Sequence, residues 1–135
     1  MHSRSTTIVA AARRCVGTRF RPQGRAPGIG LDCIGVALFA GAAAGARFTV
    51  PRYALGGDGQ EALDTALPEQ GCTPVGLPRP GDLILVAPAS GRRHLGIVTD
   101  AGIIHAHAGL NRVVEGPLDP AWRRLGAWRF PEPQE

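Results

Sequence analysis

The 135-residue chain contains no lysine, so all 15 of its basic residues are arginine. This absence excludes Schiff-base chemistry, a phosphate-binding P-loop lysine and a lysine general base. Eleven acidic residues leave a formal net charge of +4. The arginines are scattered in runs of no more than two, and aromatic residues make up only 5% of the chain. Since single-stranded nucleic acid needs aromatic stacking platforms, we expect no nucleic-acid partner.

Long apolar runs are also missing. No stretch of 18 apolar residues occurs, so we expect no membrane span. The apolar stretch near the N-terminus covers only residues 8–12, which is too short for the core of a signal peptide. We therefore expect cytoplasmic synthesis of a soluble protein without a signal peptide. If it acts elsewhere, it must be carried there.

Cysteine is scarce and its count is odd, with Cys15, Cys33 and Cys72. A disulfide framework in a small secreted domain is normally even and denser, so free thiols are expected. The length argues for one domain over residues 1–135, and 44% hydrophobic residues suffice for a packed core.

The hydrophobic pattern changes character near residue 78. Helices are predicted over residues 5–16, 32–46 and, more weakly, 58–70, with Ser5 or Thr6 capping the first and Asp32 the second. Short β-branched runs then predict strands over 82–87, 95–99, 102–107, 112–115 and 125–130. Helices followed by a meander indicate an α+β fold, with the helices packed on an antiparallel sheet.

Cys33 follows the expected cap of the almost wholly apolar second helix. A helix N-terminus and a neighbouring imidazolium both lower a thiol pKa, so a reactive thiolate is one hypothesis for Cys33. The alternative is a small core hydrophobe, which is what most free cysteines are. Cys15 lies on an apolar helix face and Cys72 in a loop, and both are expected to serve packing.

Three of the four histidines fall within 14 residues, at positions 94, 105 and 107. A tight turn at 100–102 would let His94 and His105 face each other across adjacent antiparallel strands. Two chemistries compete. Cys33 can act as nucleophile with His94 as base and His105 as its orienting partner, or the three histidines can bind zinc. The zinc hypothesis lacks a general-base carboxylate and leaves the helix-start thiol unused, so cysteine chemistry is favoured.

Four segments, in order, carry a family resemblance across nearly the whole chain. They are Gly-Thr-Arg-Phe (17–20), Gly-Leu-Asp-Cys-Ile-Gly (30–35), Arg-Pro-Gly-Asp-Leu (79–83), and His-Leu-Gly-Ile-Val (94–98) with Ile-Ile-His-Ala (103–106). The set resembles the NlpC family of papain-like cell-wall cysteine peptidases. The ending, over 113–124 with Trp-Arg-Phe-Pro, is similar to the subgroup encoded in phage and gene-transfer-agent tail clusters.

The resemblance implies a papain-like fold with the catalytic cysteine at a helix N-terminus, and no cofactor or metal. Cys33 would attack a peptide carbonyl, His94 would be base and then acid, His105 would hold the His94 ring, and the Cys33 N–H would donate to the oxyanion. Family substrates are peptidoglycan stem peptides, usually cut between γ-linked D-glutamate and a diamino acid. Phage-like tail proteins would be partners, and the protein would act on the cell wall within a phage-like particle.

Further residues are expected to shape the site or bind substrate: Asp32, Phe20, Arg93 and His107. Arg93, like Arg21, could meet the free carboxylates of a stem peptide. The chain departs from the family where it has Phe20 in place of a common tyrosine, and Ile34 in place of a common serine. The missing hydroxyl leaves an alternative function open, a tail or wall-binding module that has lost activity.

Overall fold

The computed structural model describes residues 3–49, 63–89 and 92–133. The described helices are α1 (Arg4–Cys15), α2 (Cys33–Ala43) and α3 (Leu63–Glu69). The described strands are β1 (Arg25–Ala26), β2 (Gly30–Leu31), β3 (Thr73–Val75), β4 (Leu83–Ala87), β5 (His94–Thr99), β6 (Gly102–His107), β7 (Arg112–Gly116) and β8 (Arg123–Arg129). Residues 58–62 of the third predicted helix lie outside the described residues.

The main sheet is antiparallel throughout and has the strand order β3-β8-β4-β5-β6-β7. The predicted meander forms its β4-to-β7 half, while β8 returns to pair with β4 and separates it from β3. The short strands β1 and β2 make a separate hairpin just before α2. The predicted α+β architecture, with helices on an antiparallel sheet, is therefore confirmed.

The start of α1 differs from the prediction of a Ser5 or Thr6 cap. Ser3 is the cap, because its backbone is extended and its hydroxyl accepts a hydrogen bond from the Thr6 N–H at 3.1 Å. Gly17, with a φ of 92°, follows the helix end as predicted. Within the described ranges, no helix has the length and apolar character needed to cross a lipid bilayer.

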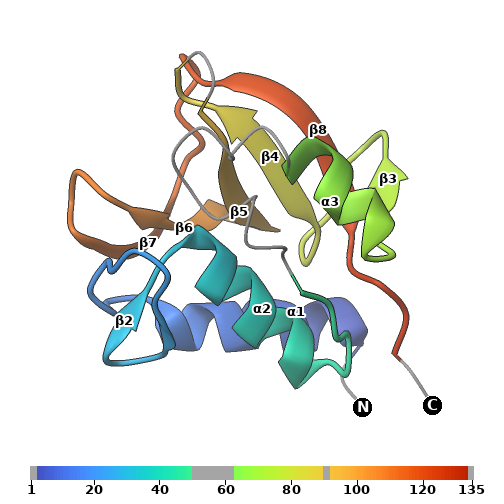
Figure 1. Ribbon diagram of the computed structural model, residues 1–135, viewed down its shortest axis with the longest axis horizontal. Helices are drawn as coiled ribbons and strands as arrows, with labels where there is room; N and C mark the ends of the chain where they lie inside the picture. The colour runs from blue at the N-terminus through green and yellow to red at the C-terminus, as the bar shows by residue number, and fades with distance from the viewer. Residues whose placement is uncertain (1–2, 50–62, 90–91, 134–135) are drawn as a thin grey trace.

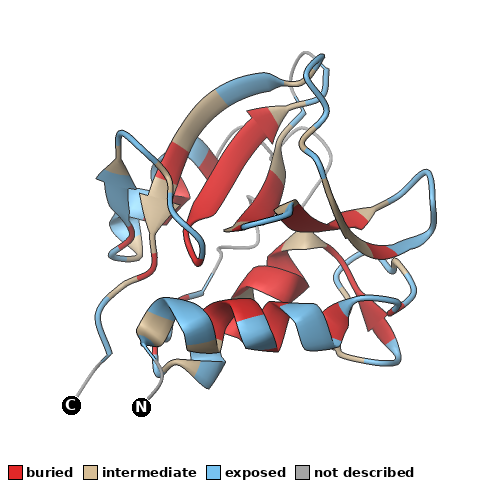
Figure 2. Cartoon of the chain, turned by 180° about the vertical axis from the view of Figure 1, so that it is seen from behind, coloured by how far each residue is buried: buried red, intermediate tan, exposed pale blue. Residues whose placement is uncertain are grey.

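The core lies between the two long helices and the sheet. One face of α1 is buried, and α2 is buried over most of its length because its residues are almost all apolar. Figure 1 shows α1 and α2 side by side on one face of the sheet, and Figure 2 shows buried residues concentrated where they meet it. This packing holds α2 against β5 and β6.

The buried carboxylate of Asp82 explains the Arg-Pro-Gly-Asp-Leu segment. It accepts two hydrogen bonds from the Arg129 guanidinium, at 3.0 and 3.1 Å, and one from the Arg79 N–H at 2.8 Å. Asp82 is 3% exposed, and a buried charge of this kind is costly unless it is paired. The segment therefore fastens the start of β4 to the end of β8.

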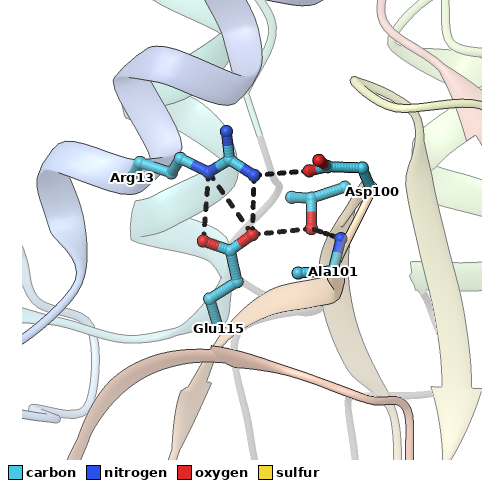
Figure 3. Close-up of polar contacts among 5 residues, drawn as sticks. Arg13, Asp100, Ala101 and Glu115 are labelled. Carbon is cyan, nitrogen blue, oxygen red and sulfur yellow. Dashed lines mark hydrogen bonds and ion pairs between the residues drawn. The ribbon is translucent and has the colours of Figure 1, made fainter.

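An ion-pair network fixes α1 to β7 and to the turn that joins β5 and β6 (Figure 3). The Arg13 guanidinium contacts Glu115 on β7 at 2.9 Å and Asp100 in the β5–β6 turn at 2.6 Å. The Thr99 hydroxyl donates to Glu115 at 2.8 Å and accepts the Ala101 N–H at 3.1 Å. These contacts hold Glu115 on the helix side of the sheet.

A close backbone approach positions α2. A Cβ added at Gly35 would lie 2.2 Å from the carbonyl oxygen of Gly24, in the loop before β1. Only glycine allows the first turn of α2 to pack this closely against that loop.

We therefore expect Gly35→Ala to destabilise the protein by about 1–3 kcal/mol, because the backbone of the preceding loop must move. The measurement is urea unfolding at equilibrium. Gly76→Ala is the control, since a Cβ there meets nothing within 4 Å, and it should change stability by less than about 0.5 kcal/mol. Equal effects of the two substitutions would contradict this account of the α2 packing.

Candidate active site

Cys33 is the first residue of α2, and Asp32 is its N-cap as predicted. One carboxylate oxygen of Asp32 accepts the Gly35 N–H at 2.8 Å and an Arg25 nitrogen at 2.8 Å. The other oxygen accepts the Gln23 N–H, also at 2.8 Å. Asp32 therefore fixes both the first turn of α2 and the loop that precedes it, which leaves Cys33 in a defined position.

The strands β5 and β6 diverge at the end where Cys33 lies. Their ladder joins Ile97–Thr99 to Gly102–Ile104 and does not reach Leu95. The backbone of Leu95 instead forms a hydrogen bond with the Cys33 thiol. The thiol thus contacts the backbone of the residue that directly follows His94.

His94 and His105 form a hydrogen-bonded pair. Nε2 of His94 lies 2.7 Å from Nδ1 of His105, and the two rings meet edge to face with centroids 4.9 Å apart. The predicted approach of these two side chains is confirmed, but they are not directly opposite. The register pairs Ile97 with Ile104, which by count would set His105 against Gly96. The rings therefore meet diagonally, where the strands have separated.

Both histidines are neutral at pH 7. Burial lowers the pKa of His94 to about 3, with His105 and His107 adding repulsion, and burial lowers the pKa of His105 to about 4. Since a neutral imidazole carries one N–H, one ring must donate to the other. If Nε2 of His94 donates, Nδ1 of His94 keeps its lone pair and can act as a base.

The pKa of the Cys33 thiol is raised, whereas the sequence predicted a lowered value. Burial raises its pKa to about 11, and the negative charge of Asp32 acts in the same direction. Hydrogen bonds from the backbone of Leu95, Ile34 and Cys33 itself oppose this effect but do not outweigh it. With His94 neutral as well, no imidazolium is present to favour the thiolate, so the resting site holds a neutral thiol.

Trp122 is a component of the site that sequence reasoning missed. Its indole packs edge to face on both imidazoles, with centroids 5.4 Å from His94 and 5.6 Å from His105. It belongs to the segment between β7 and β8 and packs with Ile84 and Val86 on the sheet face away from the helices. By keeping water from the histidine pair, it contributes to the burial that holds both rings neutral.

The other predicted site residues have defined places. Phe20 is half-buried against the core and bridges to Leu31, just before the Asp32 cap. The Arg93 guanidinium is bound by both carboxylate oxygens of Asp64 on α3, at 2.8 and 3.1 Å, so it is already engaged by a protein carboxylate.

The histidine geometry does not fit the alternative zinc site. Nitrogens of His94 and His105 point at each other at hydrogen-bond distance, whereas zinc ligands direct their lone pairs at a shared centre about 2 Å away. Nδ1 of His107 accepts the Leu110 N–H at 3.1 Å. Among the described residues, no group of three or more histidine, cysteine or acidic side chains is arranged to hold a metal ion.

The remaining cysteines, Cys15 and Cys72, are buried in the main core, as predicted for packing residues. Their thiol pKa values are raised by burial to about 11.

Two solved structures from Trichomonas vaginalis share this fold. NlpC2 matches 96% of this chain with a TM-score of 0.73 and 16% sequence identity, and NlpC1 matches 93% with a TM-score of 0.69 and 18% identity. The chain covers 48% and 44% of those proteins, or about half their length. No protein-family model matches the sequence, and no curated protein matches it. The likeness shows an NlpC-like, papain-like fold.

The raised thiol pKa predicts how Cys33 reacts with iodoacetamide. Because only the thiolate reacts, the rate should rise about tenfold per pH unit from pH 7 to pH 10, and at pH 7 it should be about a hundredth of that of an unperturbed thiol. Mass spectrometry of the peptide containing Cys33 measures the rate separately from Cys15 and Cys72. A rate that levels off below pH 8 would contradict a neutral resting thiol.

Proposed function

We propose that this chain is a cysteine peptidase that hydrolyses peptidoglycan stem peptides. Its fold is that of papain-like hydrolases. The observation that carries the proposal is the 2.7 Å hydrogen bond between His94 and His105, together with the hydrogen bond between the Cys33 thiol and the backbone of Leu95, the residue after His94. A thiol, a base and a group that orients the base are the parts that nucleophilic acyl transfer needs.

In the first step, His105 accepts a hydrogen bond from Nε2 of His94, and Nδ1 of His94 takes the Cys33 proton as sulfur attacks the peptide carbonyl. Because both groups start neutral, proton transfer accompanies attack. The first N–H groups of α2 have no carbonyl partner within the helix. Those of Cys33 and Ile34 face the sulfur, where they can stabilise the oxyanion.

In the second step, protonated His94 returns the proton to the leaving amine, and the peptide C–N bond breaks to leave a thioester on Cys33. Water then attacks the thioester with His94 again acting as base, which releases the carboxylic acid and restores the thiol. The reaction consumes one water molecule and needs no cofactor.

The substrate assignment rests on the family resemblance. The bond cut would be the one between γ-D-glutamate and a diamino acid, which leaves the α-carboxylate free on the same residue as the reacting carbonyl. The chain is basic, with a net charge of +4, and this favours an acidic peptide substrate.

The site of action follows from the same resemblance. In this proposal, the protein is made in the cytoplasm and carried to the cell wall as part of a phage-like particle, with tail proteins as its partners. Support for this comes from the C-terminal segment over 113–124, which is similar to the tail-associated subgroup.

One observation favours a second function, a binding module that has lost activity. The Phe20 side chain, where the family often has tyrosine, packs against the core and offers no hydroxyl beside the nucleophile. Such a module would keep its affinity for muropeptides and release no amine from them.

The test is hydrolysis of purified muropeptides, followed by mass spectrometry and by release of new amines. Cys33→Ala should reduce turnover by at least about a thousandfold, since it removes the nucleophile. Cys72→Ala is the matched control and should keep activity, because Cys72 is a buried packing residue between α3 and β3 and does not lie at the start of α2. Wild-type turnover in the Cys33 variant would exclude the proposed nucleophile. Binding without turnover in the unmodified protein would identify the inactive module.

A further inference from the structure

Three side chains that can donate hydrogen bonds form a row across neighbouring strands beside the histidine pair. His107 on β6 is paired with Arg112 on β7, and Arg112 is bridged in antiparallel register to Arg19 in the segment after α1. Directly opposed residues of antiparallel strands project to the same face with Cβ atoms about 5 Å apart. His107, Arg112 and Arg19 therefore lie next to one another on one face.

This face carries the histidine pair of the candidate active site. His105 and His107 are two residues apart on β6, so they point the same way, and their ring centroids are 5.5 Å apart. Glu115 points to the opposite face, where Arg13 binds it. The row thus begins at the histidine pair and extends away from it without meeting that carboxylate.

The two arginines of the row are exposed and have no partner among the described residues. Within the described ranges, neither Arg19 nor Arg112 makes an ion pair or a side-chain hydrogen bond, whereas Arg13, Arg25 and Arg129 each bind a carboxylate. Like charges placed directly opposite in a sheet repel each other. A bound anion would remove this repulsion, and the protein supplies none from its described residues.

The hydrogen bonding of His107 adds a third donor. Its Nδ1 accepts the Leu110 N–H at 3.1 Å, so the ring N–H lies at Nε2. Nε2–H is then available to a ligand. The row presents one imidazole N–H and two guanidinium groups.

The row is also linked through the backbone to the segment that leads into α2. The Arg19 carbonyl accepts the Leu31 N–H at 3.0 Å, and Cys33 follows Leu31 by two residues. One end of the row is therefore tied to the backbone that leads into α2, and the other end lies beside His105.

We propose that Arg19, Arg112 and His107 form a subsite that binds a carboxylate of the peptide substrate. This inference rests on the proposed function and adds the residues that select the substrate. Guanidinium groups bind carboxylates through paired charge-assisted hydrogen bonds, which gives both affinity and orientation. The assignment replaces Arg93, whose guanidinium is held by Asp64.

The experiment measures binding to the Cys33→Ala protein, so that no hydrolysis occurs. The probes are two synthetic stem tetrapeptides, one with the free D-glutamyl α-carboxylate and one with that group converted to a primary amide. Calorimetry should show about tenfold tighter binding of the carboxylate peptide. Adding Arg19→Gln and Arg112→Gln should abolish the difference.

The control pair is Arg47→Gln with Arg123→Gln, which removes the same two charges from exposed positions after α2 and on β8. It should keep the preference for the carboxylate peptide. Equal affinity for the two peptides, no binding of either, or an equal loss in both double variants would overturn the subsite.

The outcome separates the two proposals. A preference for the carboxylate that depends on Arg19 and Arg112, in a protein whose unmodified form releases no amine, supports the subsite and contradicts the peptidase. Hydrolysis of both peptides with no such preference supports the peptidase and contradicts the subsite.

Discussion

The hydrogen bond between His94 and His105 is the interaction on which the candidate site depends. It requires β5 and β6 to separate before their ladder reaches His94, and this separation directs the Leu95 backbone to the Cys33 thiol. Trp122 packs edge to face on both rings. Burial by these neighbours keeps both rings neutral, and a neutral His94 is the form that can accept a proton.

The thiol is held against the Leu95 backbone, next to this pair in the chain, because hydrogen bonds fix the loop before α2. Asp32 accepts hydrogen bonds from Gln23, Arg25 and Gly35, so the loop and the first helical turn form one unit. The same packing also changes the chemistry of the thiol. The same burial and the nearby Asp32 charge raise the thiol pKa, which makes proton transfer to His94 part of the reaction.

Local sequence signals predicted much of the fold and part of the site. The β4-to-β7 meander and the α2 cap followed from short-range patterns, namely β-branched runs between turn residues and an aspartate before an apolar helix. The raised pKa of Cys33 could not be predicted from the sequence, because desolvation depends on the tertiary packing around the thiol. Trp122 and the opposition of Arg19 to Arg112 were also missed, since strand register outside a hairpin leaves no local signal.

The central claim is that His94 is a neutral base held in one tautomer by His105. Nitrogen-15 NMR of the histidine rings at pH 7 tests it most directly, with His94 and His105 signals assigned from their glutamine variants. The account predicts a protonated Nε2 and an unprotonated Nδ1 on His94. A protonated Nδ1, in either an imidazolium or the opposite tautomer, would contradict it, because the ring would then have no lone pair to accept the Cys33 proton.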